Sequence, residues 1–577
     1  MPLLVKKKRE RRVRSYGFSA RNMKDREQST PVHRRIRVLM VFFIIFGSLI
    51  LFRLIRLQIL DGNYYYALAF DQHEIFQQLY PQRGTIYIQQ KGLDGDNELF
   101  PVATNRELRL VYAIPKDIGD PEAVSQALQE VLDFSEDISK LKKEVEMPEL
   151  PDLTAEEIER EKDRLEKLAL EEAGELFQAK LLERLSKVDD PYEPIQHRVS
   201  DEQVAQLEAY NLDGIHSVKE PARYYPEKGV GSHLIGFVGH TSENNLLKGY
   251  YGIEGTYDTQ LGGEAGFLRS ELDSAGRWIA VAGKEFKQAT DGSDVVLTID
   301  KVIQYYACEQ LFFGIDAYGA DSGSIIVMDP KTGAIISMCS HPGFNPNEYN
   351  QVDDVGVYNN PALLASYEPG SIFKPFTMAA AIDKGKITPF TTYNDPGEVK
   401  IDVYTIRNSD LQSHGVQTMT QVLENSLNTG TIFAARQIGM RAFAEYMRDF
   451  GFGQLTGIDL SPEAKGTIAS LDKKSEIYMA TASFGQGITV TPLQIVKAYA
   501  ALANDGKLVQ PYVVDRIIEP DGSVTQTQSK VVGQVISPKT SKQVGGMLVS
   551  VVQNGHAGAA KVEDYLVAGK TGTAQVP

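Results

Sequence analysis

The 577-residue sequence is poor in cysteine, with only Cys308 and Cys339. Two cysteines are too few for the disulfide framework of a small secreted domain. An oxidising compartment would permit one bond between them, but we expect two buried free thiols. The nine histidines form no HExxH or similar ligand spacing, which argues against a metal site. We therefore expect the protein to use neither a metal nor another cofactor.

The sequence also has few long hydrophobic segments, and the candidate for a membrane span near the N-terminus is short. Residues 38–52 are uncharged but number only 15, between Arg37 and Arg53, whereas a span needs roughly 17–25 residues. Extended to 36–57, the segment would make a helix of about 33 Å, with its arginines reaching the interfaces. No small-x-small cleavage site follows. We expect an uncleaved anchor at 36–57 rather than a signal peptide or a buried core helix.

Charge is distributed unevenly along the chain, which has a net charge of −16. Residues 1–37 carry 13 Lys/Arg against 3 Asp/Glu, and the remainder carries 47 against 73. A basic head on an acidic body fits nucleic-acid binding or membrane topology. The apolar segment that follows favours the membrane, so we expect no nucleic-acid partner. Basic residues that flank a membrane span generally lie on its cytoplasmic side. This rule predicts a cytoplasmic tail at 1–35 and an extracytoplasmic body after about residue 60.

The segment Tyr-Glu-Pro-Gly-Ser-Ile-Phe-Lys-Pro at 367–375 predicts a turn that delivers Ser371 to the start of a helix. Ser371 and Lys374 are three residues apart and would share a helix face. A lysine amine can take a serine proton only if its pKa is lowered by burial or by a nearby cation. The same spacing recurs at Ser139 and Ser470, in charged segments that we interpret as solvated.

Two further short motifs follow Ser371. Ser426-Leu-Asn428 ends a predicted helix at 419–427, where a plain helix cap is the alternative interpretation. Residues 566–575 predict a strand that contains Lys570-Thr-Gly-Thr573, with glycines that permit close backbone approach. A cation and hydroxyls beside a nucleophile suit a substrate with a terminal carboxylate. A second Lys-Thr-Gly at 331–333 lies in a predicted hairpin turn, and we give it no role.

The order and spacing of Ser-x-x-Lys, Ser-x-Asn and Lys-Thr-Gly resemble penicillin-binding proteins and class A β-lactamases. Pro81-x-Arg-Gly84, Arg-Tyr-Tyr-Pro at 223–226 and the segment 483–494 resemble class B penicillin-binding proteins, so the resemblance covers about residues 36–577. It implies an α+β fold. A single N-terminal transmembrane helix would precede an elongated pedestal domain and a transpeptidase domain with an antiparallel sheet flanked by helices.

We predict four segments on this basis. They are a cytoplasmic tail (1–35), an anchor (36–57), a pedestal or dimerisation domain (58–288) and a transpeptidase domain (289–577). An acidic insertion at about 120–190 predicts two or three amphipathic helices, with Thr154 in a capping box. We favour a solvated structural insertion over a partner-binding role. In the last domain the pattern predicts a helix at 301–318, strands at 323–328 and 334–339, and a helix at 493–504.

The resemblance implies a membrane-anchored serine D,D-transpeptidase that cross-links peptidoglycan stem peptides through an acyl-enzyme. Ser371 would be the nucleophile, Lys374 its base and Ser426 a proton relay. The backbone N–H groups of Ser371 and Thr573 would form the oxyanion hole. β-Lactams would acylate Ser371. The residues expected to bind substrate are Asn428, Lys570, Thr571, Gly572 and Thr573.

Three other interpretations stay open. The protein could be a D,D-carboxypeptidase, a β-lactamase, or a scaffold of a cell-wall synthesis complex that is non-catalytic or truncated. Members of the family continue beyond the Lys-Thr-Gly strand with two more strands and a helix, so we expect this chain to be a fragment ending at Pro577. A glycosyltransferase and division or elongation proteins are the expected partners. Whether the role is septal or elongational, which acceptor amine is used and the oligomeric state are left open.

Overall fold

The computed structural model describes residues 39–43, 45–50, 74–79, 81–92, 97–142, 155–187, 192–241, 247–271 and 285–574. The predicted cytoplasmic tail and most of the predicted anchor lie outside these ranges, although residues 39–43 and 45–50 are helical. Among the described residues, no helix has both the length and the apolar character that crossing a membrane requires.

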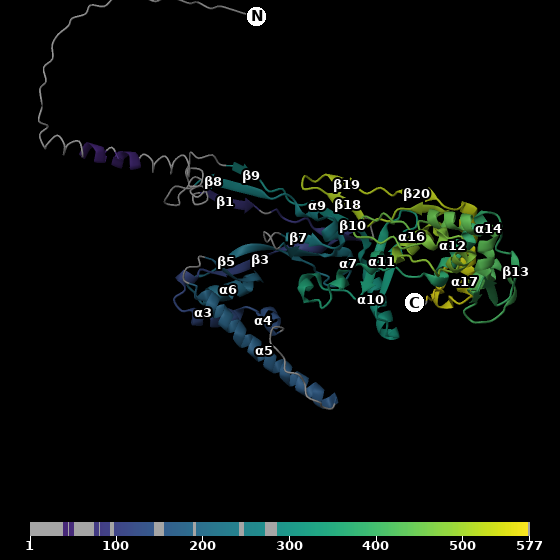
Figure 1. Ribbon diagram of the computed structural model, residues 1–577, viewed down its shortest axis with the longest axis horizontal. Helices are drawn as coiled ribbons and strands as arrows, with labels where there is room; N and C mark the ends of the chain where they lie inside the picture. The colour runs from purple at the N-terminus through teal and green to yellow at the C-terminus, as the bar shows by residue number, and fades with distance from the viewer. Residues whose placement is uncertain are drawn as a thin grey trace, which may run out of the picture. The chain divides into compact units, whose positions relative to one another are not determined.

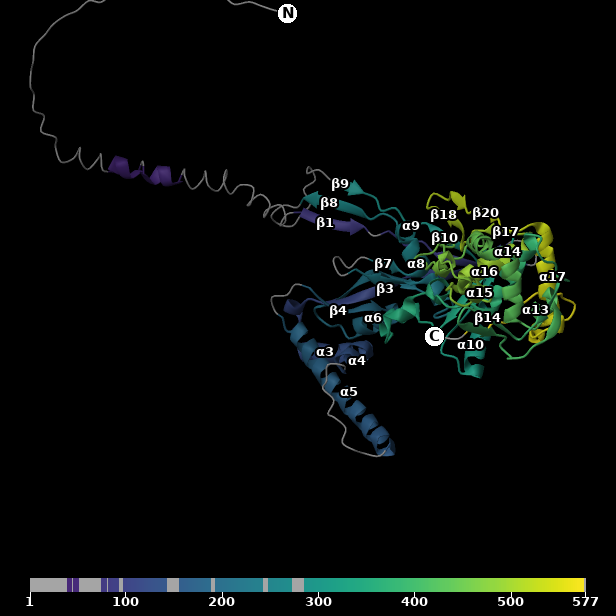
Figure 2. The same cartoon turned by 45° about the vertical axis from the view of Figure 1, so that its right-hand side comes forward.

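The chain divides into two compact units, each of which is described by itself. The smaller comprises Met1–Gln77 and Phe267–Phe286, and the larger comprises Gln78–Gly266 and Lys287–Pro577. A three-stranded sheet characterises the smaller unit, in the order β1-β8-β9 (Figure 2). Its strands are β1 (Glu74–Leu79), β8 (Gly266–Glu271) and β9 (Glu285–Lys287).

The larger unit is built on a seven-stranded sheet in the order β19-β18-β10-β2-β3-β4, with β5 also paired to β3. The strands are β2 (Ile86–Lys91), β3 (Asn97–Ala113), β4 (Glu193–Val199), β5 (Ile215–Tyr224), β10 (Asp294–Asp300), β18 (Val514–Ile518) and β19 (Val524–Gln526). Strand β3 is continuous over 17 residues.

Strand β10 connects the two parts of this sheet, because it pairs with β2 on one side and with β18 on the other. Its Val-Val-Leu run is fully buried, as expected for a β-branched strand covered on both faces. It pairs parallel with β2, Val295 opposite Ile86, and antiparallel with β18, Val295 opposite Ile517. Segments more than 400 residues apart in the sequence thus share one sheet. The predicted boundary at 288/289 falls just before β10 and stays a prediction.

The predicted acidic insertion is helical, as expected. It forms α3 (Pro121–Val131), α4 (Ser135–Lys142) and α5 (Ala155–Leu185), followed by α6 (Asp201–Ala209). Phe177 and Leu181 of α5 are buried in a cluster with α3 and β4. Leu168, an apolar residue of the same helix, is 49% exposed. It precedes Phe177 by nine residues, which is half a turn off the buried face at 3.6 residues per turn. Thr154 lies outside the described residues.

A buried ionic cluster joins the segment before β2, strand β5 and two short helices, α8 (Gly252–Thr256) and α9 (Asp258–Gly262). Glu254 is fully buried between two arginines, accepting from Nε of Arg83 and Nε of Arg223 at 2.7 Å each. Arg83 also donates to Asp258 at 2.8 Å. Burial alone would raise the pKa of Glu254, but the two guanidinium groups outweigh it and lower that pKa. The carboxylate is therefore ionised inside the fold.

The neighbouring elements are α7 (Ser232–Ile235), β6 (Phe237–His240) and β7 (Leu247–Tyr250).

The remainder of the larger unit begins with α10 (Lys301–Tyr318) and the antiparallel pair β11 (Gly323–Met328) and β12 (Ile335–His341). The helix and the first strand have the predicted bounds, whereas β12 runs two residues beyond the predicted 334–339. The Asp300 side chain caps α10 by accepting from the backbone N–H groups of Val302 and Ile303. The second Lys-Thr-Gly lies in the β11–β12 turn, where the Thr332 hydroxyl donates to Asp329 at 2.9 Å. Its place is explained by turn geometry.

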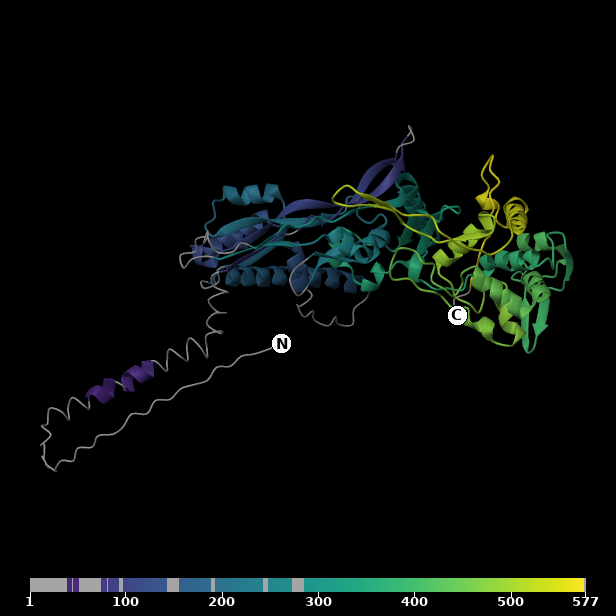
Figure 3. The ribbon, with the colours of Figure 1, turned by 90° about the horizontal axis from the view of Figure 1, so that it is seen from above.

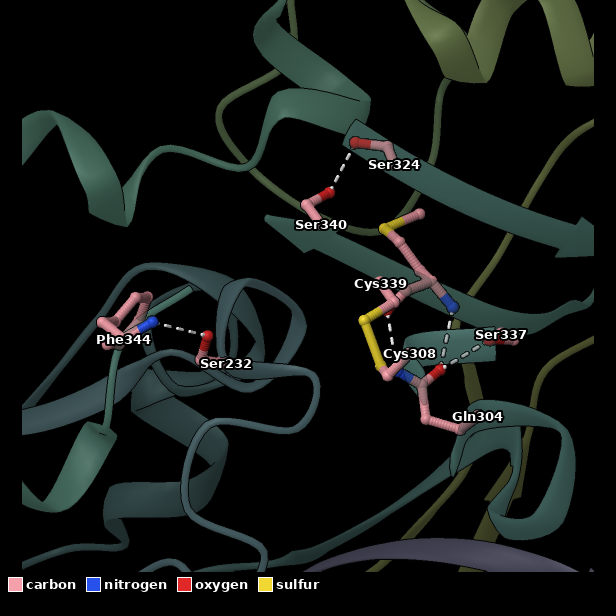
Figure 4. The surroundings of a disulfide bond; sticks show 9 residues. Ser232, Gln304, Cys308, Ser324, Ser337, Cys339, Ser340 and Phe344 are labelled. Atoms are coloured by element: carbon pink, nitrogen blue, oxygen red, sulfur yellow. Dashed lines mark hydrogen bonds between the residues drawn. A yellow bond between two sulfur atoms is a disulfide. The ribbon is translucent and has the colours of Figure 1, made fainter. Parts of the chain in front are cut away.

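The two cysteines form a disulfide, so the expectation of free thiols is wrong. Cys308 of α10 and Cys339 of β12 are bonded, with their Cα atoms 5.5 Å apart (Figure 4). The sequence separates them by 31 residues, and only the packing of α10 on β12 brings them together. Gln304 ties the same elements, because its amide nitrogen donates to the Met338 carbonyl and its amide oxygen accepts from the Ser337 hydroxyl, both at 2.9 Å.

A helical core supports the candidate site (Figures 1 and 3). At its centre is α12 (Lys374–Asp383), whose residues 374–382 are all buried, packed against α14 and α17. The other elements here are α11 (Pro361–Leu364), β13 (Thr392–Asp395), β14 (Glu398–Ile401), β15 (Tyr404–Arg407), β16 (Gly415–Thr418), α13 (Met419–Glu424), α14 (Asn428–Asp449), α15 (Glu476–Ala482), α16 (Pro492–Ala503), β17 (Lys507–Val509), β20 (Val531–Gln534) and α17 (Pro538–Asn554). The predicted helix at 493–504 is α16.

Candidate active site

Ser371 lies in a tight turn at the start of α12, as predicted. A short 3₁₀ helix, η5 (Gly370–Phe373), leads directly into α12. Gly370 has φ of +58°, a conformation that side chains of L-residues rarely adopt. A Cβ there would lie 2.5 Å from the carbonyl oxygen of Thr573. The turn therefore requires glycine twice over, for its backbone angle and for the close approach of the Lys-Thr-Gly segment.

Two side-chain hydroxyls and the segment 483–487 hold this turn. Tyr499 of α16 donates its hydroxyl to the carbonyl of Ile372 at 2.7 Å. Thr377 donates to the carbonyl of Ser483 at 2.7 Å, and the backbone N–H of Gly370 donates to Gly485 at 3.0 Å. The segment 483–494, which resembles class B penicillin-binding proteins in sequence, therefore supports the Ser371 turn from outside it. Tyr499 was not anticipated, because a tyrosine within an apolar helix gives no signal of its distant partner.

Lys374 is completely buried at the first turn of α12. Its Nζ donates to the carbonyl oxygen of Ser426 at 2.5 Å and to the Ser426 hydroxyl at 3.1 Å. Burial, and then the positive charge of Lys570, lower the pKa of Lys374 well below its usual value. Neither cause is opposed by a nearby carboxylate in the described chain. The structure thus favours a neutral amine here.

Ser371 itself is half-buried, and within the described chain its hydroxyl has no hydrogen-bond partner. The pairing of Ser371 with Lys374 inferred from their spacing is therefore not a formed hydrogen bond. Lys374 instead contacts Ser426, 52 residues away. The two side chains still arise one turn apart, with the serine hydroxyl available to a substrate.

Ser426 occupies the turn between α13 and α14 with φ of +54°, which is unusual for a residue with a Cβ. Its hydroxyl lies between two amines, with Nζ of Lys374 and Nζ of Lys570 each at 3.1 Å. The structure thus brings together three of the predicted residues that come from separate motifs. A hydroxyl shared by two amines is well placed to pass a proton between them.

The segment that carries Lys570 is not a strand, contrary to our expectation for 566–575. Residues 566–574 have no regular secondary structure, and no described strand pairs with them. A strand needs a hydrogen-bonded partner, and here the Gly569 N–H donates to Leu548 of α17 instead. Packing nevertheless keeps this segment close to the Ser371 turn. The backbone at Gly572 lies so near Ile372 that a Cβ on Gly572 would be 2.7 Å from the Ile372 side chain.

Lys570 is half-buried, and its burial lowers the pKa of its amine to about 8. Nζ donates to the Thr571 carbonyl at 3.0 Å in addition to Ser426. Thr571, Gly572 and Thr573 are exposed. A cationic amine beside exposed hydroxyls forms a surface that can receive a carboxylate.

Asn428 begins α14 and is half-buried. Its side-chain nitrogen donates to the Arg407 carbonyl on β15 at 2.8 Å. Within the described chain its side-chain oxygen has no partner. The amide is therefore oriented by protein on one side and open on the other. The plain-cap interpretation does not hold, because the N-cap of α14 is Leu427 and makes no side-chain cap.

The family comparisons agree with this geometry. Residues 323–577 match the family described as the penicillin binding protein transpeptidase domain, and residues 78–297 match the penicillin-binding protein dimerisation domain. The stage V sporulation protein D of Bacillus subtilis is 32% identical over 554 residues, which are 95% of this chain and 77% of that protein. The peptidoglycan D,D-transpeptidase FtsI of Escherichia coli is 30% identical, over 64% of this chain and 59% of that protein.

Solved structures give the same picture. The chain is similar to penicillin-binding protein 2X of Streptococcus thermophilus, with a TM-score of 0.65 at 20% identity, covering 87% of this chain and 72% of that one. It is also similar to penicillin-binding protein 3 of Mycobacterium tuberculosis complexed with ampicillin, with a TM-score of 0.59 at 24% identity, covering 86% and 82%. At these identities the likeness establishes the fold, a dimerisation domain followed by a transpeptidase domain.

Proposed function

This chain belongs to the penicillin-binding protein family of peptidoglycan D,D-transpeptidases, a family of serine acyltransferases, and on that premise we propose that Ser371 is its nucleophile and Lys374 its general base. The observation that carries the proposal is the state of Lys374. An amine that is fully buried, faces no carboxylate among the described residues and lies near a second cation loses its proton readily. A neutral amine one turn from a serine is what hydroxyl activation needs.

In the first half-reaction, Ser371 Oγ attacks the carbonyl carbon of the penultimate D-Ala of a stem peptide while Lys374 takes the hydroxyl proton. A C–O bond forms and the C–N bond to the terminal D-Ala breaks. Ser426, which hydrogen-bonds to both lysines, passes a proton to the leaving amine. In the second half-reaction an amine of a neighbouring stem peptide attacks the ester. The new C–N bond releases Ser371, and the proton of the attacking amine returns to Ser371.

We assign substrate binding to the two segments flanking Ser371. Lys570, Thr571 and Thr573 would receive the terminal carboxylate, and Gly572 permits the close approach of this segment to Ile372. Asn428 would accept from the peptide N–H through its open side-chain oxygen. The backbone N–H groups of Ser371 and Thr573 would stabilise the oxyanion, a contribution of about 3–4 kcal/mol per donor.

The same site would accept β-lactams as covalent inhibitors, since they present an acyl carbon and a carboxylate in similar positions. We test the proposal by treating the full 577-residue chain with a labelled penicillin and locating the adduct by peptide mass spectrometry. We expect one adduct on Ser371, absent from Ser371→Ala. Labelling elsewhere, or none from folded protein, would contradict the proposal. With a stem-peptide donor, a product joined to an added amine indicates transpeptidation, and free acid indicates carboxypeptidase activity.

We further propose that the catalytic part lies outside the cell membrane, anchored by residues 36–57. The basic head before an apolar segment supports this, as does the disulfide between Cys308 and Cys339, because such bonds persist in oxidising compartments. In spheroplasts, external protease should degrade residues beyond about 60 and spare an N-terminal epitope. Protection of the catalytic part would contradict this location.

A further inference from the structure

A buried carboxylate lies behind the Ser426–Asn428 turn, at the end of β13. The Asp395 side chain is 1% exposed. Its Oδ1 accepts from the Thr429 hydroxyl at 2.6 Å and from the Gly397 N–H at 3.1 Å. Its Oδ2 accepts from the Asn408 side chain and from the His414 N–H, both at 2.9 Å. Both oxygens are thus fully used.

None of these four donors is a cation. A buried charge held only by neutral donors is unusual, and it depends on all of its hydrogen bonds being kept. Burial would raise the pKa of Asp395, but the hydrogen bonds, led by that of Thr429, outweigh it and lower the pKa. Asp395 therefore remains ionised. We call Asp395 and its four donors the hub, because each segment that donates to this carboxylate is held in a defined position.

The hub is connected directly to the candidate site. Thr429, its closest donor, is the residue after Asn428, and its backbone N–H also donates to the Asn408 side chain at 3.2 Å. Asn428 in turn donates to the carbonyl of Arg407, the residue before Asn408. Arg407, the last residue of β15, and Asn408, the residue after it, thus hold two consecutive residues at the start of α14.

This support matters because the turn it holds is strained. Ser426 has φ of +54°, and its hydroxyl must stay within 3.1 Å of two amines at once. A residue in this conformation persists only when its surroundings determine its position. Lys374 holds the turn from one side, through the Ser426 carbonyl. The Asp395 network holds the α14 side, through Thr429 and Asn428.

We propose that Asp395 is a positioning residue for the acyl transfer: through Thr429 it fixes the Ser426–Asn428 turn against Lys374 and Lys570. This inference rests on the proposed function. Asp395 touches neither the substrate nor Ser371, and it acts by geometry alone. Displacing catalytic groups by about 1 Å can slow a reaction about 100-fold. We expect loss of the Asp395–Thr429 bond to slow acylation about 10- to 100-fold.

The test measures acylation of the full chain by a chromogenic β-lactam in stopped flow, which separates the first-order acylation constant from the dissociation constant of the initial complex. Thr429→Val removes the hydroxyl and keeps the shape, whereas Thr429→Ser keeps the hydroxyl. We expect the valine variant to lose acylation rate and the serine variant to stay within about threefold of the parent. Asp395→Asn should behave as Thr429→Val does, because an amide nitrogen cannot accept from the donors around it.

The double variant distinguishes positioning from general destabilisation. If Thr429 acts through Asp395, Asp395→Asn combined with Thr429→Val should be no slower than Asp395→Asn alone. Asp521→Asn, which alters an exposed carboxylate that accepts from the Ser523 N–H, is the matched control and should acylate normally.

The outcomes separate the two proposals. Folded Thr429→Val that acylates as fast as Thr429→Ser would overturn the role of Asp395 and leave Ser371 as nucleophile. If Asp395→Asn does not fold, the valine and serine variants decide the question by themselves. A parent chain that forms no adduct would overturn the proposed function, and the role of Asp395 with it.

Discussion

Two lysine amines share one serine hydroxyl at this site, and their charge states depend on each other. Lys374 is buried and lies near Lys570, and both factors lower its pKa. Lys570 is itself partly desolvated, with a pKa of about 8. Both effects shift Lys374 toward its neutral form, which is the form required by the proposed role of Lys374 as the base, while Lys570 has the proposed role of carboxylate receptor. The positive charge of Lys570 near Lys374 thus helps to lower the pKa of Lys374, as the proposed base requires.

Substituting Lys570 with methionine should change the pH dependence of acylation. In the parent, the first-order acylation constant should rise as Lys374 loses its proton and fall as Lys570 does, at a pKa of about 8. Lys570→Met removes a neighbouring cation, so the pKa of Lys374 rises and the ascending limb moves to higher pH. The descending limb disappears. Loss of a charged hydrogen bond to the carboxylate should slow acylation about 10- to 100-fold.

The measurement is a pH–rate profile for a β-lactam in stopped flow, from pH about 5 to 10. Lys561→Met is the control, because Lys561 is exposed in the segment leading to the site. An ascending limb that stays in place after Lys570→Met would refute the electrostatic coupling of the two amines.

Among the elements of the catalytic part, α12 is flanked by two glycines that share a backbone conformation and differ in surroundings. Gly370, before the helix, has φ of +58°, and a Cβ there would meet Thr573. Gly385, after the helix, has φ of +66°, and a Cβ there would have no atom of the described residues within 4 Å. The same substitution at both places therefore separates backbone preference from the close approach of the Lys-Thr-Gly segment.

Gly385→Ala should destabilise the protein by about 1–2 kcal/mol, the cost of a left-handed alanine, and leave acylation unchanged. Gly370→Ala has the same backbone cost and in addition displaces Thr573. We expect it to reduce the acylation constant at least about tenfold. Urea unfolding and acylation kinetics on both variants make the comparison. Equal acylation by the two would mean that the approach of Thr573 to the turn does not matter.

At the scale of the whole molecule, the larger unit depends on pairings between distant segments. Strand β10 joins β2 and β18, and Glu254 joins the segment before β2 to the end of β5 through Arg83 and Arg223. These contacts hold the sheet together, and they lie outside the candidate site. Their loss should therefore affect stability more than chemistry.

Glu254→Gln should lower the free energy of unfolding by about 3–5 kcal/mol, since it leaves two buried guanidinium groups without their carboxylate. Asp201→Asn, at an exposed pair with Arg109, should change it by at most about 1 kcal/mol. The folded-state pKa of Glu254 is lowered, so its contribution is present above the usual glutamate pKa and is lost as pH falls through the folded value. Urea unfolding at several pH values tests both statements. Equal losses in the two variants would argue against the buried cluster as a main source of stability.

Much of this protein was determined by local sequence pattern. The helix at 301–318, the strand at 323–328, the turn before α12 and the helical insertion were all predicted, because capping residues, β-branched runs and periodicity act within a few residues. Ser371, Lys374, Ser426 and Lys570 are proposed as site residues in the same way, from short motifs in a fixed order. Their neighbours in space were not predicted.

What only the tertiary structure decided are the contacts between segments remote in the sequence. The disulfide, the bond from Lys374 to Ser426 and the Asp395 network join residues 31, 52 and 34 positions apart. Asp395 precedes Pro396-Gly397 and in the sequence resembles an ordinary turn residue. The segment 566–574 has the composition of a strand, yet a strand forms only where another backbone offers hydrogen bonds. Periodicity reports which face of an element is buried, and packing alone decides what that face meets.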